Sequence, residues 1–213
     1  MNNRSTDQSD TILEGATLPL MEHFYTLQGE GHHAGSAAYF LRLGGCDVGC
    51  RWCDVKESWD GSKHPMVVVD QMLHWINASG AKNVVITGGE PTMHNLSALI
   101  TTLRAAGKAV WMETAGTSPM TMKPDWVCLS PKKFKAPRAE WLEVADEFKL
   151  VVFHPSDLAW AQQFLSHLPV HCKKFVQPEW EKREQILPLL IEWVKSHPDW
   201  RLSLQTHKYL DIP

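Results

Sequence analysis

Short apolar runs alternate with amphipathic segments along most of this chain. Seven runs rich in apolar and β-branched residues have the length of strands and lie between turn-forming residues. They occupy residues 38–43, 83–87, 109–113, 126–129, 149–153, 174–177 and 202–205. Because their apolar positions are nearly continuous, we expect strands that are buried on both faces of a parallel sheet.

Helical periodicity separates many of these strands. In residues 94–106, Leu96, Leu99, Ile100 and Leu103 recur at helical spacing and form one apolar face. Residues 66–78, 155–167 and 183–196 are also predicted helices, the last of them with a proline in its first turns. This alternation predicts an α/β fold with right-handed crossovers. In so short a chain it favours an incomplete, trimmed β/α barrel, whose chemistry lies at the carboxyl ends of the strands.

Composition limits the partners and the location. The chain has 213 residues and a net charge of −3, so it carries no basic footprint for nucleic acid. No apolar run reaches the roughly 18 residues of a membrane span, and the polar first residues do not resemble a secretion signal. We therefore expect a cytoplasmic protein without nucleic-acid or membrane partners. Residues 1–15 are predicted to be a loose tail and residues 16–213 a single domain.

Three of the five cysteines form one tight group. Cys46, Cys50 and Cys53 have the spacing C-x3-C-x2-C and directly follow a predicted strand. Iron–sulfur clusters are held by thiolates, usually four, so three would leave one iron open to a small molecule. Structural zinc usually takes four ligands in two pairs, whereas Cys128 and Cys172 each stand alone. The pattern favours a 4Fe–4S cluster over a zinc site or three buried structural cysteines.

A second motif closes the next predicted strand. Residues 87–91 read Thr-Gly-Gly-Glu-Pro, in which the glycines allow a ligand to approach the backbone and Glu90 can accept a hydrogen bond from an ammonium group. Together with the cysteine group, this run resembles the radical S-adenosylmethionine (SAM) superfamily. The resemblance implies that SAM binds the open iron and is cleaved to a 5′-deoxyadenosyl radical.

The resemblance extends over nearly the whole chain and narrows to the 7-carboxy-7-deazaguanine synthases. It rests on residues 25–31, 40–43, 46–54, 87–91, 113–117, 130–132, 175–178 and 204–208. It implies conversion of 6-carboxy-5,6,7,8-tetrahydropterin to 7-carboxy-7-deazaguanine with loss of ammonia, in the synthesis of queuosine and related 7-deazapurines. It also implies a homodimer and an electron donor such as flavodoxin or ferredoxin.

The same resemblance implies a set of contact residues. Gln28 and Glu30 can pair with the donor and acceptor edge of a pterin, and Arg42 offers a fork suited to its carboxylate. The predicted substrate contacts are Leu27, Gln28, Gly29, Glu30, Arg42, Thr87 and, through the chain end, Pro213. The predicted SAM contacts are Trp52, Cys53, Asp54, Gly89, Glu90, Ser130, Pro131, Lys132, Val176, Gln177, Pro178 and Glu179.

Magnesium and a rival activity remain open. The family often has Thr directly after Cys-Asp, where its hydroxyl helps to bind Mg2+, but here Val55 follows Asp54. Valine has no oxygen, and Mg2+ takes hard oxygen ligands, so only Asp54, substrate and water could hold the ion. A glycyl-radical-enzyme activase shares both motifs and is the rival function. A redox-inert binding module with zinc or a structural cluster is the rival of a different class.

Overall fold

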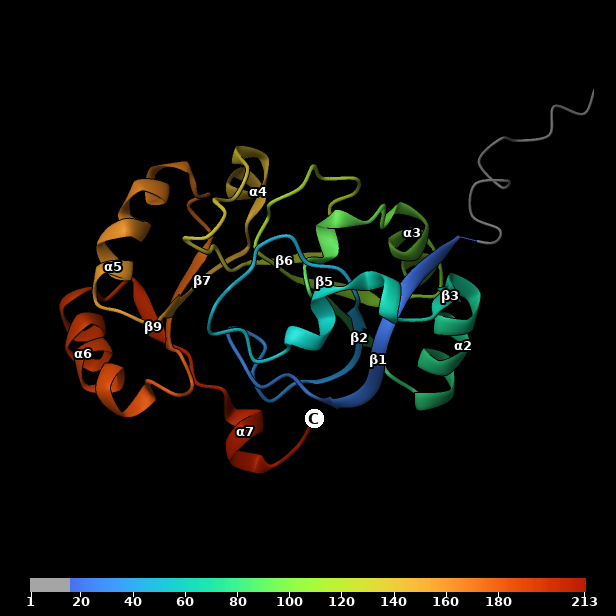
Figure 1. The fold of residues 1–213 in the computed structure, drawn as a ribbon, viewed down its shortest axis with the longest axis horizontal. Helices are drawn as coiled ribbons and strands as arrows, with labels where there is room; N and C mark the ends of the chain where they lie inside the picture. Colours follow the sequence, from blue (N-terminus) through green and yellow to red (C-terminus); the bar gives the residue numbers. More distant parts are fainter. Residues whose placement is uncertain (1–15) are drawn as a thin grey trace, which may run out of the picture.

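The computed structural model describes residues 16–213, which form one nine-stranded sheet with helices on its outer side (Figure 1). The strand order is β3-β1-β2-β4-β5-β6-β7-β8-β9. The seven successive strands β2, β4, β5, β6, β7, β8 and β9 are paired in parallel. Strand β1 pairs antiparallel with both β2 and β3. Because β3 and β9 are separate edges, the sheet stays open, in agreement with the predicted trimmed barrel.

The element bounds are as follows. The strands are β1 Thr17–Leu27, β2 Ala37–Leu43, β3 Met66–Val68, β4 Asn83–Gly88, β5 Ala109–Thr114, β6 Trp126–Leu129, β7 Glu147–Val152, β8 Lys173–Pro178 and β9 Trp200–Leu202. The α-helices are α2 Val69–Ser79, α3 Ser97–Ala105, α4 Ala139–Val144, α5 Ser156–Ala161, α6 Arg183–Ser196 and α7 Thr206–Leu210. Short 3-10 helices are η1 Lys56–Trp59, η2 Gly61–Lys63, η3 Pro91–Met93 and η4 Gln162–His167.

Six of the seven predicted strands agree with the structure to within two residues. The seventh, predicted at 202–205, overlaps β9 only at Leu202, where the observed strand ends. The chain then leaves the sheet, and Thr206 N donates to Gly29 O at 2.9 Å. Strand β1 was not predicted. Polar residues on the exposed side of this strand interrupt its apolar positions, so β1 has no continuous apolar run. The prediction also missed α4 and α7, which are short, and β3, which was assigned to the helix that begins three residues later.

The two faces of the sheet have different surroundings. On β4, Val84 and Ile86 pack in the large core under the helices, while Val85 lies in a smaller apolar cluster with Phe40 and Trp111. This alternation follows from the two-residue period of a strand. It leaves the side chains of the inner face free to line a cavity. The predicted loose tail, residues 1–15, lies outside the described residues. Among residues 16–213, no helix has the length and apolar character that crossing a membrane requires.

Candidate active site

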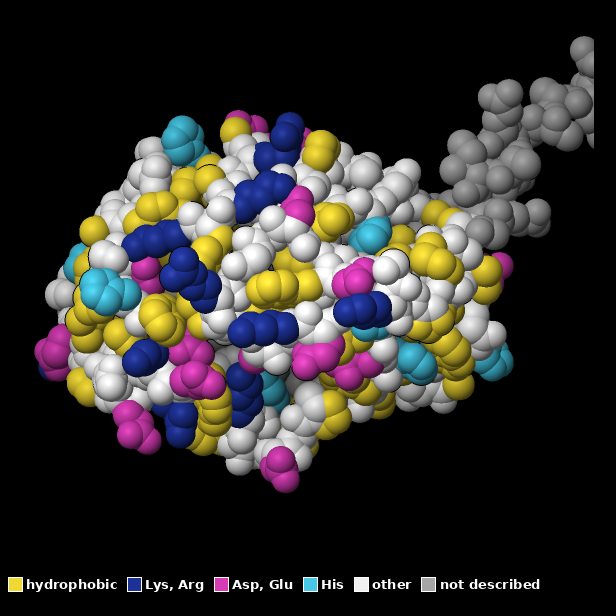
Figure 2. Space-filling model, in the orientation of Figure 1, with side chains coloured by type: hydrophobic (Ala, Val, Ile, Leu, Met, Phe, Trp, Pro, Cys, Tyr) yellow, Lys and Arg dark blue, Asp and Glu magenta, His cyan; other side chains and the backbone are white. Residues whose placement is uncertain are grey.

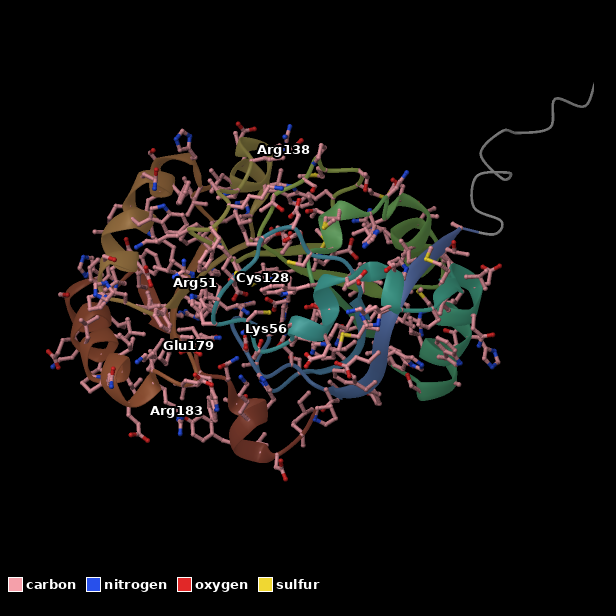
Figure 3. All side chains as sticks on the ribbon, viewed as in Figure 1. Arg51, Lys56, Cys128, Arg138, Glu179 and Arg183 are labelled. Carbon is pink, nitrogen blue, oxygen red and sulfur yellow. The ribbon has the colours of Figure 1, made fainter. Side chains whose placement is uncertain are left out.

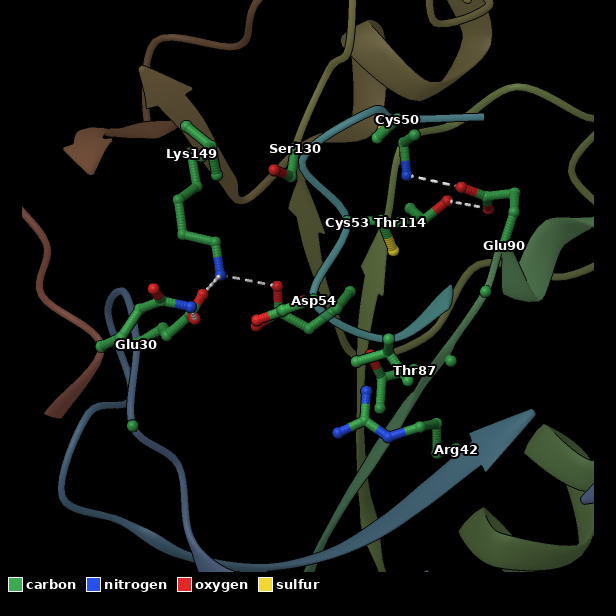
Figure 4. A pocket seen from close by; sticks show the side chains of 18 of the residues that line it. Glu30, Arg42, Cys50, Cys53, Asp54, Thr87, Glu90, Thr114, Ser130 and Lys149 are labelled. Atoms are coloured by element: carbon green, nitrogen blue, oxygen red, sulfur yellow. Dashed lines mark hydrogen bonds and ion pairs between the residues drawn. The ribbon is translucent and has the colours of Figure 1, made fainter. Parts of the chain in front are cut away.

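One pocket of about 280 Å³ brings the predicted site together at the carboxyl ends of the parallel strands (Figure 4). It contains all three cysteines of the motif and all seven predicted substrate contacts: Cys46, Cys50, Cys53, Leu27, Gln28, Gly29, Glu30, Arg42, Thr87 and Pro213. Most predicted SAM contacts also line it: Trp52, Cys53, Asp54, Gly89, Glu90, Ser130, Lys132, Gln177 and Glu179. The placement agrees with the expectation that parallel strands present their chemistry at this end.

Three predicted SAM contacts do not line the pocket: Pro131, Val176 and Pro178. Val176 lies in the core under the helices, because the strand period that turns its neighbour Gln177 into the pocket turns Val176 away. Pro131 and Pro178 are buried beside the strand ends. The structure therefore does not bring these three side chains to the cavity.

The cysteine loop follows β2 and is shaped by glycines. Gly45 and Gly49 have φ values of 101° and 70°, a region that other residues rarely adopt. Asp47 anchors the loop, since it accepts a hydrogen bond from Thr117 Oγ1 at 3.1 Å and is paired with Lys135. The three thiols are free and belong to one contact cluster. The loop thus presents three unbonded thiols to the pocket, which is the donor set that a 4Fe–4S cluster takes.

The donor set bears on the kind of metal group. Within residues 16–213, no three His, Cys, Asp or Glu side chains form a group placed to hold a single metal ion. Three free thiols that line one pocket are the donors that a 4Fe–4S cluster with one open iron takes, so the residues present fit such a cluster.

The turn after β4 packs directly on the cysteine loop. A Cβ built on Gly88 would lie 2.1 Å from the carbonyl oxygen of Leu43, and one on Gly89 would lie 2.3 Å from that of Gly45. Neither position has room for a side chain, so glycine is required for this close approach. The two motifs found in the sequence therefore form one surface.

Glu90 is buried beneath that surface and is already hydrogen-bonded within the protein. Its Oε1 accepts from Thr92 N at 3.1 Å, from Thr92 Oγ1 at 2.6 Å and from Thr114, and its Oε2 accepts from Ala115 N at 2.7 Å (Figure 4). These bonds tie the turn to β5. The carboxylate therefore has a clear structural task, while its contact with an ammonium group stays a prediction.

A charged network occupies the other side of the pocket. Lys149 Nζ lies 2.6 Å from Glu30 Oε2 and 2.7 Å from Glu113 Oε2, and its side chain is only 2% exposed. Burial by itself raises the pKa of Glu30, but the charge of Lys149 and hydrogen bonds from Lys149 and Gln205 lower it to about 2. The neighbouring carboxylates outweigh the desolvation of Lys149 and hold its pKa well above the ordinary value. Lys149 and Glu30 are therefore both ionised at neutral pH.

Gln28 joins this network and fixes its own orientation. Its Nε2 donates to Glu113 Oε1 at 3.1 Å, and its Oε1 accepts from Glu30 N at 3.1 Å. Gln28 is buried, whereas a glutamine in a simple polar turn would be exposed to solvent. The predicted pair Gln28 and Glu30 is thus preorganised, which reduces the entropy lost on binding.

The sequence analysis missed five polar residues of the pocket: Glu113, Thr114, Lys149, Gln205 and His207. Lys149 is a lone cation in a run that is otherwise apolar, and Glu113 ends another such run. A charge inside a buried strand is rarely tolerated without a partner, so this signal was present in the sequence. Gln205 and His207 carried no such signal, because they reach the pocket only through the C-terminal crossing.

Arg42 and Asp54 both carry ion pairs. Arg42 Nε donates to Glu22 Oε1 at 2.5 Å, and the arginine also faces the pocket beside Thr87 (Figure 4). Lys208 Nζ of α7 lies 2.8 Å from Asp54 Oδ2, which connects the end of the chain to the cysteine loop. Both site residues are therefore held in place by the protein.

The C-terminal segment closes one side of the pocket. Thr206 donates to Gly29 O through its N–H at 2.9 Å and through its hydroxyl at 2.8 Å. A Cβ on Gly29 would lie 2.2 Å from Nδ1 of His207, so Gly29 makes room for that imidazole. Burial lowers the pKa of His207. The segment thereby brings His207 and Pro213 to the pocket.

The chain is similar in sequence and fold to proteins of a known family. Residues 41–149 match the Radical SAM superfamily. The chain is 48% identical over 203 residues to the 7-carboxy-7-deazaguanine synthase of Flavobacterium psychrophilum, covering 95% of this chain and 96% of the relative. It is 36% identical to that of Escherichia coli, over 91% and 98% of the two chains. The crystal structure of QueE from Escherichia coli superposes with a TM-score of 0.85 at 32% identity, covering 95% of this chain and all of that one.

The fold and the paired motifs define a radical SAM enzyme, and the chain belongs to that superfamily. Family membership implies a 4Fe–4S cluster and SAM as cofactors. Within the superfamily, the chain belongs to the 7-carboxy-7-deazaguanine synthase family. The predicted fold class and family are confirmed. The rival predictions of an activase and of a redox-inert binding module are set aside.

Proposed function

We propose that this chain converts 6-carboxy-5,6,7,8-tetrahydropterin to 7-carboxy-7-deazaguanine with loss of ammonia, in the synthesis of queuosine-type 7-deazapurines. The observation that carries the proposal is that the three cysteines and the Gln28, Glu30 and Lys149 network line one pocket. When bound, the cluster supplies the electron that cleaves SAM and yields the 5′-deoxyadenosyl radical. The protein orients both molecules and excludes water.

We assign the residues of the pocket to two subsites. Cys46, Cys50 and Cys53 would hold the cluster. Beside them, the backbone at Gly89 and the polar side chains of Ser130 and Gln177 suit the amino acid and nucleoside parts of SAM. The other side chains assigned to SAM are Trp52, Asp54, Glu90, Lys132 and Glu179. Pro131, Val176 and Pro178 would contact SAM only through their backbone.

On the other side of the pocket, ring N–H groups of the pterin meet acceptors. Glu30 and Glu113 are carboxylates fixed by Lys149, so each keeps a defined direction toward the ring. Arg42 would receive the substrate carboxylate through the nitrogens that Glu22 does not use. Leu27, Gly29, Thr87 and Pro213 complete the wall.

An anaerobic assay tests this function. Protein with a reconstituted cluster, SAM, a chemical reductant and the carboxytetrahydropterin should form 7-carboxy-7-deazaguanine and ammonia. SAM cleavage without deazaguanine formation would contradict the substrate, and no SAM cleavage at all would contradict the assignment of the cluster site.

We propose an acidic redox protein such as flavodoxin or ferredoxin as the electron donor. Lys and Arg side chains gather on the face drawn in Figure 2, although the whole chain has a net charge of −3. Arg51, Lys56 and Arg138, labelled on this face in Figure 3, are exposed, and Arg51 lies between two of the motif cysteines. These three basic side chains, here called the basic rim, would steer an acidic partner toward the cluster.

Reversing one charge on the basic rim should lower only the reaction rate that a protein donor supports. We expect Arg51→Glu to lower the rate supported by flavodoxin by about tenfold at low salt, because rim charges act on association. The rate supported by dithionite should be unchanged, and Lys82→Glu, exposed at the opposite end of the strands, is the matched control. An equal loss with both reductants would contradict a docking role.

We propose that the activity of this chain does not strictly require Mg2+. Val55 lines the pocket where a hydroxyl would be needed. Wild-type activity should change less than about twofold between chelator and Mg2+, whereas Val55→Thr should become stimulated by about fivefold because it restores an oxygen ligand. Val55→Ala, which has no oxygen either, is the control. Loss of wild-type turnover in chelator would contradict the proposal.

We also propose that the chain is a homodimer, as its family resemblance implies. Tyr25 and Leu27 of β1 and Met66 of β3 support it, since they leave apolar side chains exposed near one edge of the sheet. Light scattering of the reconstituted protein measures the mass directly.

A further inference from the structure

A second, much smaller cavity lies next to the active-site pocket. Its size is about 10 Å³, which is near the room that a single water molecule needs. The residues that line it are Gln28, Glu30, His33, Trp111, Met112, Glu113, Trp126, Cys128 and Glu147. Because Gln28, Glu30 and Glu113 line both cavities, this small chamber touches the back of the network assigned to the pterin.

Two polar atoms of the chamber residues are buried without a partner. Neither Glu147 Oε1 nor His33 Nε2 forms a hydrogen bond with any described residue. The Glu147 side chain is almost completely buried, at 2% exposure. Buried polar groups are nearly always satisfied by protein or ordered water, so two such atoms at one small cavity indicate a bound water.

Glu147 also holds the loop that carries Gln28 and Glu30. Its Oε2 accepts from His32 N at 3.0 Å and from Trp126 Nε1 at 3.4 Å. Gly31 has a φ of 64° and packs so tightly on this carboxyl group that a Cβ would lie 1.9 Å from Oε1. The ring of His33 stacks on Trp111, with 3.8 Å between ring centroids and an interplanar angle of 2°. The loop is therefore fixed from two sides of the chamber.

We propose that Glu147 and His33 are positioning residues, bridged by one buried water, that hold the 28–31 turn so that Gln28 and Glu30 face the pterin. The proposal rests on the proposed function and deepens it. Neither residue touches the substrate pocket itself, and both act through the loop.

Charge around the chamber makes the neutral form of Glu147 the one that fits. Burial raises its pKa to about 7, helped by Glu113 and opposed by Lys149. A protonated Glu147 donates from Oε1 to the water, while Oε2 keeps its bond to His32 N. The ionisable groups on every neighbouring element are Glu113 on β5, Cys128 on β6, Lys149 on β7, Cys172 and Lys173 at β8, and Glu30, His32 and His33 on the loop.

The direction of the pH effect follows from these charges. The folded carboxyl holds its proton above the ordinary value of 4.5 and loses it as pH rises through about 7. Ionised Glu147 then competes with Glu30 for Lys149. The loop should therefore be best ordered on the acidic side of neutrality and looser at alkaline pH.

Substitution of Glu147 separates this role from a merely structural one. For the wild type, KM for the pterin should rise about fivefold between pH 6.5 and pH 8 as the carboxyl ionises. Glu147→Gln keeps a neutral group with a donor, so its KM should match the acidic wild-type value and stay flat. Glu147→Ala removes the anchor, and KM should rise about tenfold at both pH values while kcat changes much less. Glu143→Gln, the same change at an exposed glutamate of α4 away from the chamber, is the matched control.

Two readouts do not depend on pterin turnover. Glu147→Gln should melt about 3 °C or more above the wild type at pH 8 and level with it at pH 5. A high-resolution crystal structure should show the water between Glu147 and His33. A flat wild-type KM, an unchanged Glu147→Ala enzyme or a chamber without that water would overturn the inference. Failure of the proposed function is distinct, since it would abolish pterin turnover in every variant and leave melting and density to decide.

Discussion

Replacing Cys50 by serine is expected to abolish both SAM cleavage and pterin turnover. Cys50 is one of three thiols presented to the pocket by the loop after β2, and a hydroxyl is a poor ligand for iron. We expect a loss of at least about a thousandfold in each rate, or about 4 kcal/mol of barrier. Iron content, the brown colour of the anaerobic protein and the formation of 5′-deoxyadenosine measure the effect.

Cys172→Ala is the matched control for that variant. Cys172 is also buried and free, but it packs in the core under the helices rather than at the pocket. It should retain about four irons per chain and normal SAM cleavage. A Cys50→Ser protein with a full cluster and active SAM cleavage would exclude Cys50 as a ligand.

Replacing Lys149 by methionine should damage the pterin reaction and the fold while sparing the cluster. The change leaves the partly buried carboxylates of Glu30 and Glu113 beside each other without the buried ammonium that lies within 2.7 Å of both. Breaking a buried pair in this way costs about 3–5 kcal/mol of stability. With the two carboxylates protonated or displaced, kcat/KM for the pterin should fall about a hundredfold or more. SAM cleavage in the absence of pterin should persist.

Two further variants sharpen that experiment. Lys174→Met on the adjacent strand β8 removes a largely exposed ion pair with Asp199, which directly precedes β9, and should cost about 1 kcal/mol or less. Lys149→Met combined with Glu113→Gln removes one of the stranded charges and should recover part of the stability, although not the activity. Equal melting temperatures for wild type and Lys149→Met would contradict the assigned charge network.

The wild-type network also has a pH signature. The folded pKa of Glu30 lies near 2, below its ordinary value of 4.5, so its contribution to stability is present above about pH 4.5. That contribution is lost as pH falls toward 2. The sign is opposite for Glu147, whose raised pKa makes the protonated form the stable one. Acid and alkaline conditions therefore weaken different sides of the same loop.

The sequence alone determined the parallel strands, the cysteine group and the glycine turn of this protein. Each of these is local: six strands are short apolar runs, the three cysteines lie within eight residues, and the turn follows a strand directly. The half-exposed strand β1 was not predicted, because its apolar positions do not form such a continuous run. The family resemblance added the prediction that Gln28, Glu30 and Arg42 contact the substrate.

Only the tertiary structure decided how charge is distributed in the pocket. Lys149, Glu113 and Glu30 are far apart in the chain and meet because β7, β5 and the 28–36 loop face one interior. The same holds for Glu147 with His33, and for the C-terminal crossing that brings His207 over Gly29. Electrostatic partners and close backbone approaches depend on distances through space, which the spacing of residues along a chain does not encode.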